Sequence, residues 1–351
     1  MEYYLECTGC RCRYDSGYRK QVCESCGSLL EVEYRGRVRV PDGRGFWDYE
    51  KMLPKGKFKH YELGGTELVQ SSDYKNLFLK LELQNPTRSF KDRGSVVEVA
   101  KAKEYGYREV AIASTGNMAY SLSYYAKMSG IGASVFIGRD TNPNKIRDIL
   151  MTHDAALHRV DGDFSKAQEV AARYAKTRGA FLAGDFCYRK EGQKTVMYEI
   201  AAGLKGITHV IVPVGNATLL SATFKAIMDL KSSRRIRKIP RIVAVQAEGC
   251  SPLVKAVKKN AKTRYERPRT GADAIAVGLP TFGEQAIDAI RRTRGTAVAV
   301  SEKEMAAEQK RLYDDQGILA ELAGVAPIAA FKKLGFKRSD RAVAIVSGGN
   351  L

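Results

Sequence analysis

The sequence has no long hydrophobic run. No stretch of its 351 residues approaches the roughly 20 consecutive apolar residues that a membrane-spanning helix needs. Its start, MEYYLECTGC, contains no hydrophobic signal segment. Two nucleotide-binding motifs are also missing, since no Gly-x-Gly-x-x-Gly follows a predicted strand and no Gly-x-x-x-x-Gly-Lys-Ser/Thr occurs. We therefore expect a cytoplasmic protein without a membrane partner and without either of these nucleotide loops.

Acidic residues are scarce relative to basic ones. The chain has 58 lysines and arginines against 39 acidic residues, which gives a formal net charge of +19. The excess is spread along the chain, with denser stretches at KSSRRIRKIPR (231–241) and KAVKKNAKTRYERPR (255–269). We interpret these stretches mostly as solvated connections, with a nucleic-acid-binding patch as the alternative. We expect no nucleic-acid partner, and a generally positive field would attract a small anionic substrate.

Cysteine is rare after the first 26 residues, which hold five of the seven cysteines. In a cytoplasmic chain such clustering favours a metal site over disulfides. Two Cys-x-x-Cys pairs can close a tetrahedron of thiolates around zinc, and a ribbon of about 30 residues has too little core to fold without it. The expected ligands are Cys7, Cys10, Cys23 and Cys26, with Cys12 as an alternative to Cys10. The sequence thus predicts a structural zinc ribbon over residues 1–40.

Beyond the ribbon, segments typical of strands and helices alternate. The predicted strands cover 77–83, 110–113, 133–137 and the later segments THVIVPV, RIVAVQ and RAVAIV, and the first predicted helices cover 89–105 and 118–128. This alternation predicts an α/β fold with parallel twisted sheets covered by helices. We expect two lobes, at 41–185 and 186–351.

The segment NPTRSFKDRGS (85–95) places Lys91 in the first turn of the helix predicted to begin at Ser89. Ser89 and Asp92 have the spacing of a capping box. Helix N–H groups, together with Arg88 and Arg93, disfavour an ammonium group, so we expect a lowered pKa for Lys91 and a more available amine nucleophile. Taken alone, the segment is better explained by a solvated lysine on a polar helix start, because charged first turns are common.

Three predicted strands end in small, polar loops that contain glycine. These are ASTGNMAYS (113–121), VPVGNATLLS (212–221) and IVSGGNL (345–351). In parallel sheets the ligand lies at the carboxyl ends of the strands, and the first two loops open directly into helices whose N–H groups suit a phosphate. Each loop alone is better explained by the geometry of a strand-to-helix turn, which uses glycine routinely. Together with an activated lysine, the loops fit pyridoxal phosphate, which offers an aldehyde, a phosphate, a phenolic oxygen and a ring nitrogen.

The sequence resembles the fold type II pyridoxal-phosphate enzymes, and within them the threonine synthase family. The resemblance covers almost the whole chain. Its segments are the cysteine ribbon, NPTRSFKDRG, ASTGNMAYSLSYYAKMSG, GDFSKA, YRKEGQKTVMYEI, VPVGNATLLSATFKA and PRIVAVQAEGCSPLVKA. It implies a two-lobed fold in which the first lobe carries the cofactor lysine and the second carries the cofactor phosphate loop. It also implies a homodimer.

The resemblance assigns a role to each candidate residue. For the cofactor, Lys91 would bind the aldehyde, Asn117 the ring oxygen, and Ser347 the ring nitrogen. The phosphate loop would comprise Gly215, Asn216, Ala217, Thr218 and Leu219. For the substrate, the carboxylate would meet Ser114 and Thr115, and the phosphate would meet Arg189. The charge of Arg88, which the resemblance does not supply, also favours a phosphorylated substrate. The implied reaction converts O-phospho-L-homoserine and water into L-threonine and phosphate, with Lys91 carrying protons between carbon atoms.

The chain departs from the family pattern mainly where the substrate is bound. Arg88 replaces a glycine, Thr218 and Leu219 replace glycine and asparagine, AGDF occupies 183–186, and the chain ends in SGGNL as in serine and threonine dehydratases. The alternatives are therefore such a dehydratase or a synthase that uses phosphoserine. Outside the enzymes, the alternative is a basic zinc-ribbon protein that binds nucleic acid.

Overall fold

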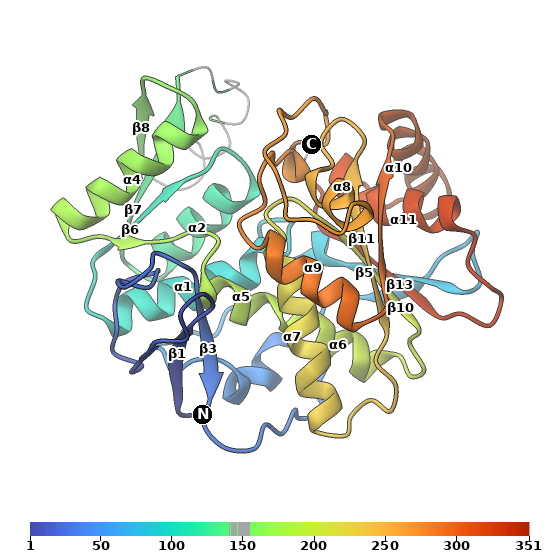
Figure 1. Ribbon diagram of the computed structural model, residues 1–351, viewed down its shortest axis with the longest axis horizontal. Helices are drawn as coiled ribbons and strands as arrows, with labels where there is room; N and C mark the ends of the chain where they lie inside the picture. The colour runs from blue at the N-terminus through green and yellow to red at the C-terminus, as the bar shows by residue number, and fades with distance from the viewer. Residues whose placement is uncertain (140, 142–145, 147–154, 351) are drawn as a thin grey trace. The chain divides into compact units, whose positions relative to one another are not determined.

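The computed structural model describes residues 1–139, 141, 146 and 155–350. Its backbone contacts divide the chain into two compact units (Figure 1). The ribbon unit comprises 1–37, 50–62 and 91–192, and the six-strand unit comprises 38–49, 63–90 and 193–351. The predicted lobes run in chain order, whereas each unit combines three separate segments, because the strand at 77–81 pairs with a strand near the end of the chain.

The ribbon unit begins with a small antiparallel sheet. Its strands, in the order β2-β1-β3, are β1 (Tyr3–Cys7), β2 (Arg13–Tyr14) and β3 (Leu30–Tyr34). Leu5, Leu30 and Val32 are fully buried, so this sheet packs one apolar face inward.

A buried lysine ties this small sheet to the rest of the ribbon unit. The Nζ of Lys101, on helix α1 (Lys91–Glu104), donates to the hydroxyl of Tyr3 at 2.7 Å and lies 4.3 Å from the ring centroid of Tyr105 and 5.1 Å from that of Tyr188. Burial lowers the pKa of Lys101, against the attraction of Glu104. The aromatic rings offset part of the cost of burying this charge, so the ribbon is anchored on α1.

A parallel four-stranded sheet forms the rest of this unit. Its order is β8-β7-β6-β9, and all pairs are parallel. The strands are β6 (Glu109–Ala113), β7 (Gly132–Gly138), β8 (Ala156–Val160) and β9 (Phe181–Leu182), and the other helices are α2 (Asn117–Met128), α4 (Phe164–Arg178) and α5 (Cys187–Gln193). Helices α2 and α4 pack on the sheet (Figure 1). The predicted strands at 110–113 and 133–137 and the helix at 118–128 are confirmed.

The start of α1 differs from the prediction. The helix begins at Lys91, and the buried Oγ of Ser89 has no hydrogen-bond partner among the described residues. The predicted capping box is therefore wrong. Ser89 instead forms an antiparallel bridge with Gly348, and the backbone N–H of Phe90 donates to the carbonyl of Ser347 at 3.0 Å. These long-range bonds hold Ser89 outside the helix.

The six-strand unit is built on a mostly parallel sheet in the order β12-β11-β10-β13-β5-β4. Only the edge pair β4–β5 is antiparallel. The strands are β4 (Leu68–Gln70), β5 (Leu77–Leu81), β10 (His209–Pro213), β11 (Arg241–Ala247), β12 (Thr296–Val300) and β13 (Ala342–Val346). Strands β10, β11, β12 and β13 carry alanine, valine and isoleucine on both faces, as expected for a sheet covered on both sides.

Helices cover this sheet and enclose a core of aliphatic side chains. They are α6 (Thr195–Gly203), α7 (Thr218–Ser232), α8 (Pro252–Lys258), α9 (Gly283–Arg292), α10 (Glu302–Gln316) and α11 (Leu322–Leu334), with short 3-10 helices η1 (Phe46–Met52), η2 (Glu82–Gln84) and η3 (Asp273–Ile275). The predicted strand at 77–83 ends at Leu81 because η2 follows it. No described helix is long and apolar enough to cross a membrane.

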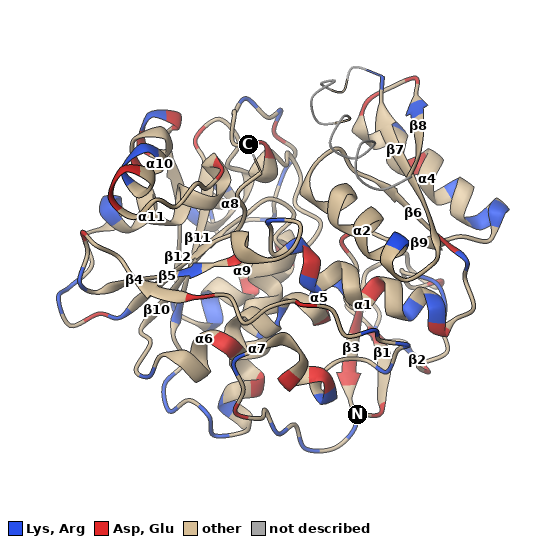
Figure 2. Ribbon diagram, turned by 180° about the vertical axis from the view of Figure 1, so that it is seen from behind, with Lys and Arg blue, Asp and Glu red and all other residues tan. Residues whose placement is uncertain are grey.

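Lys and Arg are distributed over both units (Figure 2). Of the two dense basic stretches, 231–241 runs from the end of α7 to the start of β11, and 255–269 runs from α8 into the following loop.

Candidate active site

The four predicted zinc ligands lie together in the ribbon. The Sγ atoms of Cys7, Cys10, Cys23 and Cys26 are all within 4.8 Å of one another. Two pairs are closer, with Cys7 to Cys26 at 3.4 Å and Cys10 to Cys23 at 3.6 Å. Tetrahedral zinc, with Zn–S bonds of about 2.3 Å, requires sulfurs about 3.8 Å apart. The number, type and spacing of the donors therefore fit a zinc ion.

Hydrogen bonds from Tyr14 and Ser28 lower the pKa of Cys23 and of Cys26, respectively, whereas contacts with neighbouring cysteines raise the pKa of Cys10. The backbone N–H groups of Gly9 and Cys10 donate to the Sγ of Cys7 at 3.3 and 3.4 Å. The hydroxyl of Tyr14 lies 3.0 Å from the Sγ of Cys23 and lowers the pKa of Cys23 to about 6. Cys12 lies outside the group of four, with its exposed Sγ 4.0 Å from the Oγ of Ser25.

Lys91 is the first residue of α1, and the first turns of this helix are packed tightly against α5. A Cβ on Gly94 would lie 2.6 Å from the Cγ of Arg189, and a Cβ on Gly192 would lie 1.9 Å from the carbonyl oxygen of Arg93. Only glycine permits this approach of the two helices. The position of Lys91 in the ribbon unit is thus fixed by backbone packing.

Arg189, on α5, lies under the same turn of α1. It is fully buried, and its Nη1 donates to the carbonyl of Lys91 at 3.4 Å. Its Nε donates to the carbonyl of Gly184 at 3.0 Å, and its Nη2 forms an ion pair with the carboxylate of Glu98. Burial raises the pKa of Glu98 to about 7, against the attraction of Arg189. The guanidinium therefore braces the helix that carries Lys91, and its predicted contact with a substrate phosphate stays a prediction.

Ser114, Thr115 and Asn117 follow β6 in the same unit as Lys91. Ser114 is buried, and its N–H donates to the carbonyl of Phe136 on β7 at 3.3 Å. Thr115 and Asn117 are half-buried, and Asn117 is the first residue of α2. Helix α2 packs against α1, where the Oγ atoms of Ser121 and Ser95 are 2.8 Å apart. The strand-to-helix loop predicted at 113–121 is confirmed.

The loop 215–219 connects β10 to α7 in the six-strand unit, as predicted. Ala217 caps α7 in the left-handed conformation, with φ at 64°. A Cβ on Gly215 would lie 2.8 Å from the carbonyl oxygen of Ala274, so glycine is required there. Asn216 is held at its carbonyl by the N–H of Phe282 at 2.9 Å. The loop thus leads directly into the N-terminus of a 15-residue helix, a position that suits a phosphate.

Ser347 follows β13, the neighbour of β10 in the same sheet, and it is buried. The chain beside it is the segment that leads into Lys91. Phe90, the residue before Lys91, donates to the carbonyl of Ser347, and the N–H of Gly349 donates to the carbonyl of Arg88 at 3.0 Å. The buried hydroxyl of Ser89, which has no partner among the described residues, belongs to this segment. Leu351, the last residue of the predicted loop 345–351, lies outside the described residues.

The conformation of Arg88 explains why the family pattern has glycine at this position. Its φ is 58°, in the left-handed region that glycine adopts without strain. The side chain is exposed, and its Nε donates to the carbonyl of Gly349 at 3.2 Å. Arg88 therefore braces the chain after Ser347, whatever else it binds.

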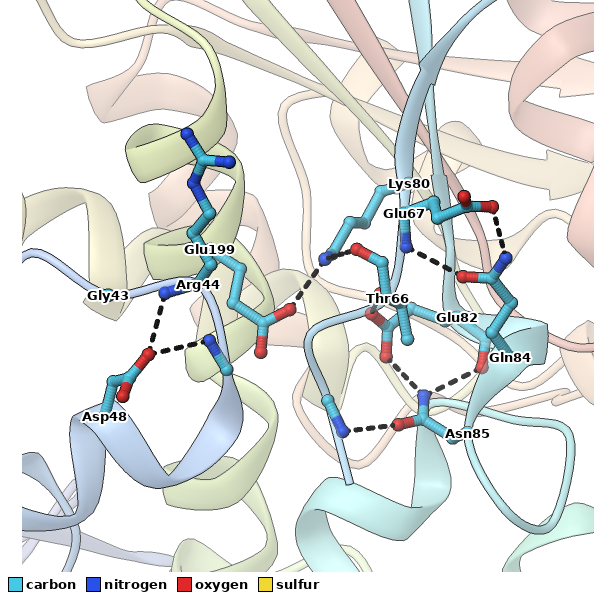
Figure 3. A network of polar contacts seen from close by, with 12 residues as sticks. Gly43, Arg44, Asp48, Thr66, Glu67, Lys80, Glu82, Gln84, Asn85 and Glu199 are labelled. Carbon is cyan, nitrogen blue, oxygen red and sulfur yellow. Dashed lines mark hydrogen bonds and ion pairs between the residues drawn. The ribbon is translucent and has the colours of Figure 1, made fainter. Parts of the chain in front are cut away.

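A buried polar network supports the segment before Lys91 (Figure 3). The Nζ of Lys80 is 2.6 Å from both the Glu199 carboxylate and the carbonyl of Thr66. The Thr66 hydroxyl donates to the carboxylate of Glu82 at 2.8 Å, and the amide of Asn85 donates to the other oxygen of that carboxylate at 2.9 Å. Sequence reasoning missed this network, although a lysine inside the apolar run LFLKL is a usable signal, because a buried charge needs a partner.

Replacing Asn85 with alanine is expected to lower the free energy of unfolding by about 1–3 kcal/mol, because buried groups lose their partners. The side-chain amide of Asn85 donates to Glu82, and its side-chain oxygen accepts from the N–H of Gly64 at 3.1 Å. Urea unfolding of the cofactor-saturated protein measures the change. The control is Gln84→Ala, whose hydrogen bonds to Glu67 are exposed and whose loss should cost within about 0.5 kcal/mol. Equal costs for the two variants would contradict the role given to the network.

The chain matches the model of a family described as "Pyridoxal-phosphate dependent enzyme" over residues 60–348. Two archaeal threonine synthases are similar over nearly the whole chain. The protein of Methanosarcina acetivorans is 34% identical, covering 99% of this chain and 92% of its own, and that of Methanocaldococcus jannaschii is 35% identical, covering 98% and 92%. Among solved structures, maize serine racemase superposes with a TM-score of 0.72 at 24% identity, covering 82% of this chain and 88% of its own.

The residues of each unit fit the cofactor that this family uses. Lys91 belongs to the ribbon unit, and the loop 215–219 and Ser347 belong to the six-strand unit; as residue types, an amine, a glycine-containing helix start and a hydroxyl suit the aldehyde, the phosphate and the ring nitrogen of pyridoxal phosphate. The fold agrees with that of the superposed structure, and the sequence match extends through all these positions. The chain therefore belongs to the pyridoxal-phosphate dependent enzymes of fold type II.

Proposed function

We propose that this enzyme is a threonine synthase, which converts O-phospho-L-homoserine and water into L-threonine and inorganic phosphate. The observation that carries the proposal is the similarity to threonine synthases over 98–99% of the chain, including the ribbon. The net charge of +19 also suits a substrate with an anionic phosphate. The enzyme class that follows is a carbon–oxygen lyase acting on phosphates.

Each candidate residue has a role in this reaction. Pyridoxal phosphate, when bound, supplies the electron sink that stabilises negative charge at the substrate Cα. The loop 215–219 would bind the cofactor phosphate, and Asn117 and Ser347 would orient its ring. Ser114 and Thr115 would bind the substrate carboxylate. The amine of Lys91 would remove and return protons at Cα and Cβ, since it stands on a fixed helix start and one mobile base can serve neighbouring carbons.

Product analysis of the purified protein tests the proposed reaction. Phosphate and threonine formed in equal amounts from O-phospho-L-homoserine support it. Formation of a 2-oxo acid and ammonia from threonine or serine, without activity on the phosphorylated substrate, would instead assign a dehydratase. The residues SGGN that follow β13 favour that second activity, because they resemble the corresponding segment of dehydratases.

Arg88 is the more accessible of the two arginines proposed to meet the substrate phosphate. Replacing it with glycine is expected to raise KM for O-phospho-L-homoserine roughly tenfold or more, since a hydrogen bond to a charged group contributes about 1.5–3 kcal/mol. The fold should survive, because glycine suits a φ of 58°. Steady-state kinetics measure the change, with Arg88→Lys as the charge-conserving control. An unchanged KM in the glycine variant would exclude a contact between Arg88 and the substrate phosphate, and would leave Arg88 only its hydrogen bond to Gly349.

We also propose that the ribbon binds one structural zinc ion. The purified protein should contain one zinc per chain, and Cys23→Ser should lose it and unfold at a lower temperature, because the ribbon has little core of its own. Metal analysis and thermal unfolding measure these changes. Cys12→Ser is the matched control and should keep its zinc, since Cys12 lies outside the group of four. Zinc retained by the Cys23 variant, or lost from the Cys12 variant, would contradict this ligand set. The homodimer and the cytoplasmic location remain predictions.

A further inference from the structure

A second candidate site lies in the six-strand unit, at the amino ends of the strands, whereas the loop 215–219 lies at their carboxyl ends. A cavity of about 1050 Å³ is lined by His209, Arg241 and Thr296, the first residues of β10, β11 and β12. Parallel strands have all their amino ends on one side of the sheet and all their carboxyl ends on the other. His209 is at the amino end of β10, and the loop 215–219 follows its carboxyl end. Five residues at roughly 3.3 Å each separate the two ends by about 16 Å. The cavity is therefore separate from the proposed cofactor site.

The cavity collects positive charge that the protein does not neutralise. Its lining includes seven lysines and arginines and only one carboxylate, that of Asp340. Arg235 is paired with Asp42, and Asp340 already accepts from the N–H of Lys337 at 2.9 Å. Within the described part of the chain, six lining cations have no carboxylate within 4.0 Å; these are Lys205, Arg237, Lys238, Arg241, Arg294 and Lys337. Their mutual repulsion would be relieved by an anion that carries several charges.

The basic stretch 231–241 therefore does more than connect α7 to β11. Residues 235–241 of it line the cavity, and Figure 2 shows Lys and Arg on the loops beside β10 and α6. Arg237 and Lys238 are exposed, so they lie at the entrance. Burial and the nearby charge of Arg241 lower the pKa of His209, which leaves the cations as the source of the positive field.

Part of the cavity lining is apolar. Leu334, Phe336, Ile236 and Val243 contribute to it. The ring of Phe336 is stacked on Phe331 with centroids 4.6 Å apart and stands edge-on to His209 at 4.9 Å. A hydrated inorganic ion does not use such a surface, whereas a flat organic group does. The volume of about 1050 Å³ is close to the upper limit of the range for small-molecule sites, about 300–1,000 Å³.

We propose that this cavity binds a nucleoside polyphosphate, with its phosphates against the cations of 237–241 and its base against Phe336 and its apolar neighbours. The proposal is independent of the proposed function, because every lining residue belongs to the six-strand unit and none is a candidate for cofactor or substrate binding. The ligand would occupy a separate site, from which it is suited to regulate the enzyme.

Calorimetric titration of the cofactor-loaded enzyme with ATP and GTP tests this proposal. Adenosine, which lacks the phosphates, and tripolyphosphate, which lacks the base, are titrated separately as the two half-ligands. We expect one nucleotide per chain, bound more tightly than either half-ligand. The double variant R237E/K238E should bind at least about tenfold more weakly, since two charge-assisted contacts are lost. It should keep wild-type turnover and cofactor absorbance. The control K259E/K303E makes the same change of charge at exposed positions outside the cavity and should bind like wild type.

Three results would overturn the proposal. The first is the absence of nucleotide binding at 1 mM, a generous concentration for a small-molecule site. The second is equal weakening in both double variants, with tighter binding of a single-stranded oligonucleotide, which would assign the charge to non-specific nucleic-acid attraction. The third is a dimer that R237E/K238E converts to monomers, which would assign the cavity to a contact between two copies of the chain.

Discussion

Replacing Lys91 with alanine is expected to lower the rate of phosphate release from O-phospho-L-homoserine by at least about 10³-fold, because the variant loses its general acid–base group and the amine that holds the cofactor aldehyde. Lys91 is the only lysine in the first turn of α1, which begins KDRG, so no neighbouring lysine can replace it. A coupled phosphate assay with saturating pyridoxal phosphate measures the loss.

The control for this prediction is Lys103→Ala, on the same helix. The Nζ of Lys103 donates to the carbonyl of Ser129 at 2.7 Å, away from the helix start. This variant should keep most of its activity. A Lys91 variant that turned over within tenfold of wild type would remove Lys91 from the mechanism.

The ion pair between Arg189 and Glu98 is expected to respond asymmetrically to mutation. At pH 8, where Glu98 is ionised, Glu98→Leu should lower the free energy of unfolding by about 3–5 kcal/mol, because it leaves a buried guanidinium that cannot lose its proton. Arg189→Met should cost less at the same pH, because Glu98, whose pKa is already raised to about 7 beside Arg189, can become neutral by binding a proton. Urea unfolding of the cofactor-saturated variants measures both costs.

The double variant R189M/E98L is the control for this pair, and it should cost less than the sum of the two single changes because neither charge is left alone. The pH dependence gives a second check. The folded carboxyl of Glu98 binds a proton more tightly than the unfolded one, so its contribution to stability is greatest below pH about 4.5 and is lost as pH rises through about 7. Equal single-variant costs at pH 8, or strict additivity, would contradict this description.

Activity of the Arg189 variant separates its two roles. A bracing role predicts a fall in stability and in kcat, because Lys91 is misplaced, with KM for O-phospho-L-homoserine little changed. The predicted contact with the substrate phosphate requires a large rise in KM instead. The burial of Arg189 and its bonds to Glu98, Gly184 and Lys91 lead us to expect the first result.

Local patterns in the sequence were enough to predict much of the fold. Runs such as THVIVPV and RAVAIV are apolar on both faces and appear as β10 and β13 at the centre of a sheet. The loop 215–219 was predictable because a strand, a glycine and a helix follow each other directly. The cysteine pairs are equally local, and their spacing was enough to bring four sulfurs together.

Contacts between distant segments were not predictable in this way. Ser89 has the spacing of a helix cap, yet its bridge to Gly348 keeps it outside α1, and no local signal reveals that partner. The partner of Arg189 is Glu98, on a different helix, so a motif could suggest a ligand role without revealing the ion pair. The cavity beside 231–241 was hidden for the same reason, because its lining comes from separate strands and helices.

Borohydride reduction of the purified enzyme, followed by peptide mass mapping, tests the central claim most directly, namely that Lys91 holds the cofactor. We expect a yellow protein that loses its colour on reduction and carries the mass of reduced pyridoxal phosphate on the peptide containing Lys91. A cofactor fixed to any other lysine, or a colourless protein that takes up no cofactor when pyridoxal phosphate is supplied, would contradict the account.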